Sequence, residues 1–532
     1  MQFNLAQKAA LAGIGMFVFS VLYTTAIFPT ILKLQLKRKV ALKKGWMMRD
    51  TWSKFPFVVN MNFYMFNVTN PDGIKEGEKP IVQEVGPFVY DKYHEKTNQE
   101  DRDEDDTISF TMRDTYFFNA EKSNGLTGDE EIIVPHYLIL GIVNALLRTK
   151  PTAVPIVGKA VDIIFSKPSS IFIKAKVKDI LFDGLFIDCT AKDFAGAAIC
   201  SEVKAAHEEF GLKMVAEDQY LLSLWAARNG TDAKARLRVK RGLKNIMDVG
   251  KVVEYDSKAN ISVWDDDYCD QFNGTDGTVF HPKFDRRGAD DIVAFNTDLC
   301  RSVSCRFQAK SKFKGIRTLR YSADLGTDGE HNELHKCYCP EPDKCLKKGA
   351  YDLMKCIKLP LVLTNPHFYM ADPSFSEQVD GMNPDPAKHQ MLIDLEPLSG
   401  APVQACTRAQ FNMFIMPVPK FKLMKKFPDA LLPLFWFDEQ IVLPDFLLKE
   451  IRGGAVMYKM GKMFGKFMMF GGLLMIMSGG GLFVKQNYMD KANSKTTVQS
   501  SNVGNGHGNG DASAEKKMNI STVQAPIPPN IS

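Results

Sequence analysis

The sequence of 532 residues lacks the short motifs that mark common enzyme active sites. It contains no G-x-S-x-G nucleophile elbow, no H-E-x-x-H zinc motif and no G-K-[ST] phosphate loop. A catalytic group assembled from distant residues stays open, although no pattern points to one. An excess of charge of one sign is also absent, because 67 basic residues stand against 62 acidic residues. This balance does not favour nucleic acid as a partner, and the sequence predicts neither an enzyme nor a nucleic-acid-binding protein.

Two long stretches contain no charged residue, one near each end of the chain. Ala9–Leu32 has 24 such residues and Phe467–Val484 has 18. At a rise of ~1.5 Å per residue, each can cross a hydrocarbon core ~30 Å thick. The first stretch is longer than the ~7–15 apolar residues of a cleaved signal peptide, and no A-x-A site closes it. We therefore read it as an uncleaved anchor, and we expect a two-pass membrane hairpin.

Cysteine is missing from both apolar stretches and from both ends of the chain, since all ten cysteines lie between Cys189 and Cys406. Four N-x-[ST] glycosylation sites also lie between the two stretches: Asn67, Asn229, Asn260 and Asn273. Both features favour an oxidising, extracellular location for the middle of the chain. Basic residues clustered in 33–44 argue for the opposite orientation, but long domains translocate largely regardless of charge. We expect an extracellular middle at the plasma membrane, with both termini cytosolic.

These features divide the chain into five parts. They are a cytosolic N-terminus (1–8), a first span (9–32), an extracellular domain (33–462), a second span (463–484) and a cytosolic tail (485–532). The tail is rich in Ser, Asn, Gly and Lys, so it cannot bury enough apolar surface to fold and is expected to be disordered. Formal glycosylation sites at Asn519 and Asn530 lie in it and should stay unmodified.

The predicted secondary structure changes twice along the middle of the chain. Phe55–Met65 places an apolar residue at every second position, which predicts a half-buried strand. From about 132 to 227, the segments 136–148, 157–165 and 201–214 have helical patterns separated by prolines. From about 237 to 446 the chain returns to short strand-like runs with many turns. The sequence therefore predicts an α+β fold with a helical insertion.

A constellation of histidine and cysteine has spacing that could hold zinc. It runs His331-x3-His335-x-Cys337-x-Cys339-x5-Cys345. Four tetrahedral ligands are available there, but thiols in a secretory compartment are more often oxidised to disulfides. We expect disulfides and no metal, with zinc as the alternative.

The helical insertion carries two further candidate features. Its apolar helices are either plain core or an exposed apolar entrance to a lipid site. Its lysines form either a solvated basic face or a surface that captures an acidic head group or an acidic partner. The candidate capture residues are Lys167, Lys174, Lys176 and Lys178.

Glycines also mark the second span and its edge. They include Gly461-x3-Gly465, Gly471-Gly472 and Gly479-Gly480-Gly481. Small residues allow helices to approach closely, so these glycines predict either contact with the first span or dimerisation.

Several short motifs give the chain a family resemblance through their order over about 430 residues. They are Glu84-Val-Gly-Pro-Phe-Val-Tyr90, Gly274-Thr-Asp-Gly-Thr278, Cys337-Tyr-Cys339, Pro366-His-Phe-Tyr369, Asp380-Gly-Met-Asn-Pro384, Asp394-Leu-Glu-Pro397 and Leu434-Phe-Trp-Phe437. With two spans and a cysteine-rich middle, the chain resembles the class B scavenger receptor family, and within it the insect sensory members.

The resemblance implies a β-barrel-like extracellular domain with a helical apex and an internal hydrophobic tunnel that leads toward the membrane. It implies three disulfides: Cys269–Cys337, Cys300–Cys356 and Cys339–Cys345. Outside that set, we expect a local bridge between Cys189 and Cys200, and Cys305–Cys406 is a weaker further pair. Some family members carry membrane-proximal cytosolic cysteines that can be palmitoylated, and this chain has none, so such acylation is expected to be absent.

The function implied by the resemblance is a non-enzymatic receptor or co-receptor of olfactory neurons, with no cofactor. It would capture fatty-chain small molecules such as pheromones and pass them through the tunnel to an odorant receptor complex in the same bilayer. The alternative is a scavenger or adhesion receptor that docks a protein or lipoprotein through a basic apex.

Overall fold

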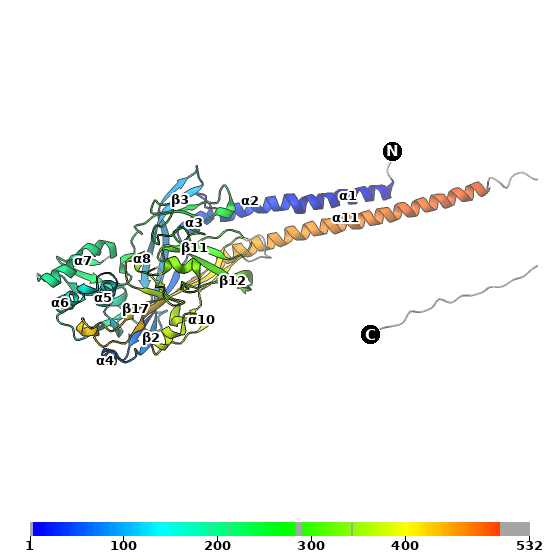
Figure 1. Cartoon of the computed structure of the whole chain (residues 1–532). Coiled ribbons are helices and arrows are strands. Elements are labelled where there is room, and N and C mark those ends of the chain that lie inside the picture. Colours follow the sequence, from blue (N-terminus) through cyan, green and yellow to red (C-terminus); the bar gives the residue numbers. More distant parts are fainter. Residues whose placement is uncertain (1–3, 192, 211, 283–289, 342–343, 501–532) are drawn as a thin grey trace, which may run out of the picture. The chain divides into compact units, whose positions relative to one another are not determined.

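The computed structural model describes residues 4–191, 193–210, 212–282, 290–341 and 344–500 (Figure 1). The chain divides into two compact units. Residues 29–460 form one, called here the large unit, and residues 1–28 with 461–532 form the other, called here the terminal unit.

Helices form both ends of the chain and cluster in one internal region. Their bounds are α1 Leu5–Leu22, α2 Phe28–Val40, α3 Met47–Ser53, α4 Pro71–Lys75, α5 Tyr137–Thr149, α6 Val154–Ile164, α7 Phe194–Phe210, α8 Met354–Ile357, α9 Pro373–Glu377, α10 Pro386–His389 and α11 Asp445–Ser500. A π-helical turn, Tyr23–Ile27, joins α1 to α2.

One antiparallel sheet dominates the large unit. Its strands are β1 Val59–Val68, β2 Val82–Arg102, β3 Thr107–Phe118, β9 Leu237–Lys240, β10 Val252–Tyr255, β11 Ile292–Asn296, β12 Arg301–Phe313, β13 Ile316–Ala323, β14 Tyr351–Asp352, β15 Val362–Thr364, β16 Leu392–Leu395, β17 Pro402–Ile415 and β18 Ala430–Val442. The order across the sheet is β10-β9-β3-β2-β1-β18-β17-β16-β13-β12-β11, and β15 carries β14 onto β17.

The two end strands of this order, β10 and β11, are joined by the segment Gly274–Thr275. The backbone N–H of Val252 donates to the Gly274 carbonyl at 3.0 Å. On the other side, the N–H of Thr275 donates to Val293 at 3.1 Å, and that of Phe295 donates to the Thr275 carbonyl at 2.8 Å. The sheet is therefore a nearly closed barrel, as expected, and the fold class is α+β.

The strand predicted over Phe55–Met65 forms as β1, which begins four residues later than predicted, at Val59. Met61, Phe63 and Met65 are buried, as the period of two requires. The pairing of β1 with β2 shifts between Phe63 and Met65, and beyond this irregularity Phe66 and Val68 are buried too. The acidic run 100–106 contains the turn that joins β2 to β3.

The insertion, about residues 132–227, holds α5, α6 and α7 together at one end of the large unit (Figure 1). It also holds two small sheets, formed by β4 Glu131–Pro135 with β5 Phe172–Lys176, and by β6 Leu185–Asp188, β8 Gln219–Leu222 and β7 Lys213–Ala216. The helix predicted over 201–214 lies seven residues earlier at its start, and its last two positions, Lys213 and Met214, belong to β7.

The buried faces of α5 and α6 are core. Val143, Val157 and Val161 pack in the same cluster as Phe63 and Phe421, which belong to the barrel and to the loop after β17. The helices are therefore tied to the barrel by ordinary apolar burial.

In the terminal unit, α1 contacts the second apolar helix through glycines. A Cβ on Gly472 would lie 2.8 Å from the backbone nitrogen of Phe17, and one on Gly479 would lie 2.7 Å from that of Ala10. The hydroxyl of Ser20 donates to the Gly465 carbonyl at 2.8 Å. Of the two roles predicted for these glycines, the structure shows contact with the first helix.

Both terminal helices are long and apolar enough to cross a membrane. The helix α11 continues beyond Val484 to Ser500, so the first part of the expected disordered tail is helical. The rest of that tail, with Asn519 and Asn530, lies outside the described residues.

Candidate functional site

Three of the four candidate apex lysines are paired with carboxylates. Lys174 lies 2.6 Å from Glu131, on the neighbouring strand, and Lys176 and Lys178 lie 3.0 and 2.9 Å from Asp129. Hydrogen bonds from Lys178 and Lys176 hold the pKa of Asp129 below its ordinary value. The basic surface that the sequence suggests is therefore largely neutralised by its own acidic neighbours.

Lys167 lies apart from these pairs, in the loop between α6 and β5. Its backbone has φ of +56°, and its N–H donates to the Asp162 carbonyl at 2.7 Å. The structure does not bring Lys167 into one cluster with the ion pairs of the other three lysines.

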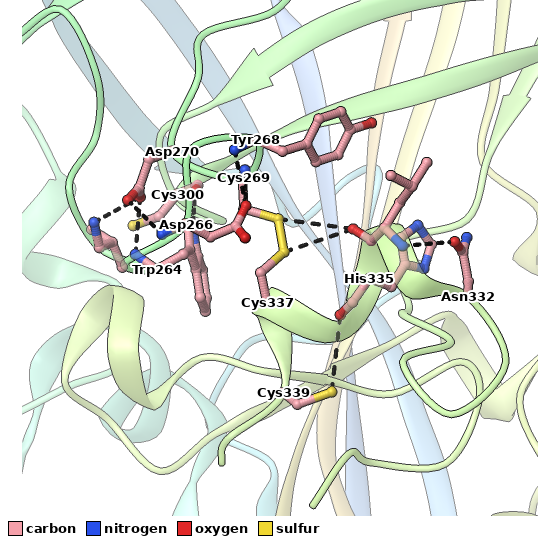
Figure 2. Close-up of a disulfide and its surroundings, with 12 residues drawn as sticks. Trp264, Asp266, Tyr268, Cys269, Asp270, Cys300, Asn332, His335, Cys337 and Cys339 are labelled. Carbon is pink, nitrogen blue, oxygen red and sulfur yellow. Dashed lines mark hydrogen bonds between the residues drawn. A yellow bond between two sulfur atoms is a disulfide. The ribbon is translucent and has the colours of Figure 1, made fainter. Parts of the chain in front are cut away.

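Four disulfides brace the large unit, and they join the eight cysteines that the sequence analysis pairs. The bridges are Cys189–Cys200, Cys269–Cys337, Cys300–Cys356 and Cys339–Cys345. Figure 2 shows the surroundings of Cys269–Cys337. There the indole N–H of Trp264 donates to the Cys300 carbonyl at 2.7 Å, which ties the loop of one bridge to the start of another.

The zinc alternative fails on the chemistry of these sulfurs. Cys337, Cys339 and Cys345 are bonded to other sulfurs, so they cannot ligate as thiolates. His335 accepts a hydrogen bond from the backbone N–H of Asp328 at 3.1 Å, and His331 lies 2.8 Å from the carboxylate of Asp328. Both histidines therefore contact Asp328 within their own loop.

The weaker expected pair, Cys305–Cys406, does not form. Both are free, buried thiols, on β12 and β17. Two strands, β13 and β16, lie between them in the sheet. Three strand spacings of ~4.8 Å exceed the ~7 Å that a disulfide can span between Cα atoms. Burial raises the pKa of Cys305 to about 12 and that of Cys406 to about 11, so both stay protonated.

The four expected glycosylation sites differ in exposure. Asn260 and Asn273 are exposed. Asn67 and Asn229 are half-buried, and their side-chain carbonyls accept the backbone N–H groups of Ile133 at 2.8 Å and Tyr116 at 2.9 Å. Exposure therefore makes Asn260 and Asn273 the more accessible of the four expected sites, whereas Asn67 and Asn229 also hold neighbouring backbone N–H groups.

A buried charged cluster, which sequence reasoning missed, lies on β2. Lys92, His94 and Lys96 alternate on one face of that strand, and all three are buried. The amine of Lys92 lies 2.9 Å from Glu439 on β18 and 3.1 Å from Asp114 on β3. The cluster therefore joins β2 to its neighbour β3 and, across β1, to β18 through ion pairs.

Lys96 connects this cluster to the segment that closes the barrel. Its amine lies 3.9 Å from the Asp276 carboxylate and donates to the Thr278 hydroxyl and the Trp52 carbonyl, each at 3.2 Å. Its amine also lies 4.6 Å from the ring centroid of Trp52. The motif Gly274–Thr278 thus holds the closure of the barrel by its backbone and by this buried pair.

Protonation in the cluster follows from these contacts. Burial lowers the pKa of Lys96 to about 8. Burial and the charge of Lys96 lower the pKa of His94. Because an ammonium can only donate, Nε2 of His94 accepts from Lys96 at 3.4 Å, and its Nδ1–H donates to Asp114 at 2.6 Å. His94 is therefore a neutral imidazole between a cation and an anion.

A second polar cluster gathers four of the motifs that carry the family resemblance. One oxygen of Glu84 accepts from Nε2 of His367 at 2.6 Å and from the indole of Trp436 at 2.7 Å. The backbone N–H of Asn383 donates to Nδ1 of His367 at 3.0 Å, and His389 stacks on His367 at 4.4 Å. Among the described residues, neither imidazole bonds to a hydroxyl or thiol, so this cluster resembles a structural joint and not a nucleophile with its base.

A hollow of about 440 Å³ lies beside the closing segment. Its lining includes Tyr268, Asn273, Phe280, His281 and Tyr338. Asn273, an exposed residue that the sequence predicts to be glycosylated, lies in the lining, and a glycan there would crowd the opening. The hollow is therefore a poor place for a fatty ligand to enter.

The fold and these clusters define a class of protein: a nearly closed antiparallel barrel with a helical insertion, braced by disulfides and bounded in sequence by two membrane-length helices. The chain belongs to the CD36 family, which matches residues 11–483.

Several relatives are named sensory neuron membrane protein 1, and three of them illustrate the similarity. The honeybee (Apis mellifera) protein is 42% identical over 527 residues, which cover 99% of each chain. The Mamestra brassicae protein is 43% identical over 436 residues, or 82% of each chain, and the Manduca sexta protein is 40% identical over 448 residues, or 84% of each. The two terminal apolar helices with the large unit between them fit a two-pass membrane protein.

Proposed function

We propose that this chain is a two-pass plasma-membrane receptor of sensory neurons that captures fatty-chain small molecules and delivers them to an odorant receptor complex in the same bilayer. The observation that carries the proposal is similarity along the whole chain, 42% over 99% of both lengths, to a sensory neuron membrane protein. The barrel, the apex helices and the terminal helices support it, because the family resemblance implies a conduit of that construction.

The proposed topology puts the large unit outside the cell and both termini in the cytosol. Four disulfides support this orientation, since disulfides persist in oxidising compartments. The segments 1–8 and 485–532 are the proposed cytosolic ends, and 9–32 and 463–484 are the proposed spans.

The free energy of capture depends on the length of the alkyl chain that is buried. Burying an alkyl chain contributes ~0.8 kcal/mol per methylene, so a dozen carbons give roughly 10 kcal/mol before the cost of association. That cost removes about half or more, which leaves binding in the micromolar range. Binding of this strength allows the release that a conduit requires. No catalytic step and no cofactor enter the proposal.

The experiment uses the full chain in phosphatidylcholine nanodiscs and a titration with fatty acetates and fatty alcohols of increasing length. Saturable one-to-one binding by native mass spectrometry, tighter with each added methylene, supports the proposal. Binding that is absent at every chain length, in protein with all four disulfides formed, contradicts it.

The same experiment separates the alternative, in which a basic apex docks a protein or lipoprotein. Reversal of charge at Lys174, Lys176 and Lys178 is the matched variant. Because the side chains of these lysines and of their carboxylate partners are between 39% and 63% exposed, and such ion pairs contribute little to stability, we expect fatty-ligand binding to be unchanged. Loss of lipoprotein binding in the same variant, with no fatty-ligand binding by the unaltered chain, would favour the alternative.

A further inference from the structure

The two apolar helices of the terminal unit fix each other's depth, because their glycine contacts set a register. Figure 1 shows α1 and the orange part of α11 running side by side. The facing residues are Gly479 with Ala6 and Ala10, Gly472 with Gly13 and Phe17, Gly465 with Ser20 and Thr24, and Gly461 with Phe28. The helices are therefore antiparallel, and these contacts fix the register between them.

In this register the uncharged stretches of the two helices do not coincide. A hydrocarbon core ~30 Å thick takes about 20 helical residues. A core that begins inside Lys8 reaches Phe28 or beyond, and Phe28 faces Gly461. Lys466 lies five residues further in than Gly461, so its Cα is at least ~8 Å below the edge of the hydrocarbon.

Moving the hydrocarbon core along the helices does not place both Lys8 and Lys466 outside it. A core that keeps Lys466 outside begins at Phe467 and takes about 20 residues of α11. Gly479 faces Ala6 and Ala10, so Lys8 would then lie close to the middle of that core. A charge near the middle of a bilayer costs more than one nearer its edge. The arrangement with Lys466 inside the hydrocarbon is therefore the favoured one.

Lys466 points away from α1. Gly465 is the residue that faces α1, and the next residue of an α-helix lies 100° further round. Lys466 is exposed, and so are Met463, Phe470 and Leu473, which lie three, four and seven residues from it and share its face. Lys462, four residues away, is exposed on the same face and lies at the edge of the core, so Lys466 is the deeper ammonium group among these large apolar side chains.

The chain itself offers no counter-charge at this depth. Residues 1–49 and 451–489 contain no aspartate and no glutamate. Neither α1 nor the spans of a second copy of this chain can therefore neutralise Lys466. An ionisable residue inside a membrane usually pairs with an opposite charge or marks a functional path.

We propose that the face of α11 formed by Met463, Lys466, Phe470 and Leu473 docks a transmembrane helix of a different integral membrane protein, one that carries an aspartate or glutamate at the depth of Lys466. The apolar side chains pack on that helix, and the carboxylate pairs with the ammonium group. The proposal rests on the two-pass topology proposed above and does not depend on the capture of fatty ligands.

The test uses a defined partner helix. The full chain, with a donor fluorophore, is reconstituted in phosphatidylcholine vesicles with an acceptor-labelled poly-leucine transmembrane peptide. The peptide carries one Glu at the depth of Lys466, and its control carries Gln. We expect association of the Glu peptide, measured by energy transfer, to be about tenfold stronger than that of the Gln peptide.

Variants of the chain locate the effect. Lys466→Leu should remove the preference for Glu, and Lys466→Arg should keep it, since the charge is retained. Lys466→Glu should prefer a peptide that carries Lys. Lys459→Ala is the matched control further along the same helix and should behave as the unaltered chain. Equal association of Glu and Gln peptides, or a preference that survives Lys466→Leu, overturns the proposal.

Two further measurements separate other occupants. Phosphatidylserine added to the vesicles should not abolish the preference; if it does, Lys466 reaches a lipid head group and the proposal fails. A bimane probe attached to the thiol introduced by Lys466→Cys should be quenched best by lipids brominated within the acyl chain, and best quenching at the head group would also refute it. Fatty-ligand binding should be the same in Lys466→Leu as in the unaltered chain, so failure of either proposal is seen independently of the other.

Discussion

Removal of the Asp276 carboxylate tests the reasoning about how the barrel is closed. In Asp276→Asn the ammonium group of Lys96 keeps its place, fully buried, but loses the only carboxylate within 4 Å of it among the described residues. Loss of one partner of a buried ion pair costs about 3–5 kcal/mol, because the other charge is left uncompensated. We therefore expect Asp276→Asn to lower Tm by roughly 5–10 °C.

The assay is thermal unfolding of the full chain in detergent at pH 7, followed by tryptophan fluorescence at one fixed scan rate. Lys174→Ala is the matched control, since it breaks an ion pair in which both side chains are at least half exposed. It should leave Tm unchanged. The double variant Lys96→Met with Asp276→Asn should recover most of the loss, because no buried charge remains. Two results would show that the Lys96–Asp276 pair does not stabilise the closure of the barrel. One is a shift in Asp276→Asn no larger than that of the control, and the other is a double variant no more stable than Asp276→Asn.

The same pair gives a pH dependence with a definite sign. Burial lowers the pKa of Lys96 from 10.5 to about 8 in the folded protein. Between these values the unfolded chain binds a proton that the folded chain has released, so stability rises with pH. The difference in Tm between the unaltered chain and Lys96→Met should therefore increase in favour of the unaltered chain from about pH 8 to about pH 10, by up to about 3 kcal/mol in stability. A difference that is constant over this range would contradict the assignment.

Disulfide removal and glycan mapping give two more expectations. Replacing both cysteines of Cys300–Cys356, which closes a loop of 56 residues, should cost about 4 kcal/mol, against about 2 kcal/mol for Cys339–Cys345 with its separation of 6; thermal unfolding measures both, and the opposite order would reject the loop-closure explanation. Asn260→Gln and Asn273→Gln should each remove one glycosidase-sensitive mobility shift, because both side chains are exposed. A chain from animal cells with no shift at either position would contradict the extracellular placement of the large unit.

The buried cluster on β2 shows why part of the architecture could not be predicted from the sequence. Lys92, His94 and Lys96 alternate with other residues along a strand, and polar residues at every second position usually form its solvated face. Their counter-charges, Asp114 and Glu439, come from β3 and β18, which are far apart in the sequence. Only the order of the strands in the sheet, β3-β2-β1-β18, shows that the polar face is the buried one.

The motif residues around Glu84 are a second case in which the sequence does not predict a contact. The motifs are visible in the sequence and their order predicts the family. Their convergence on one carboxylate is not visible, because His367 and Trp436 are about 280 and 350 residues from Glu84 in the chain. The spacing of His331 and His335 to cysteine suggested zinc ligands, whereas His367 was visible only as part of a motif and His389 belongs to none of the motifs.

Features that depend on local composition could be predicted before the fold was known. Two uncharged stretches predict membrane-length helices because length and hydropathy suffice, and a period of two predicts β1 because side chains alternate along a strand. The tertiary structure decided what depends on neighbours distant in the sequence. The bridging segment Gly274–Thr275 closes the barrel, Asp129 and Glu131 neutralise the apex lysines, and the glycine contacts set the register of α11 against α1. The physical reason is that charge pairing and helix depth are set by partners, and a single chain segment does not contain its own partners.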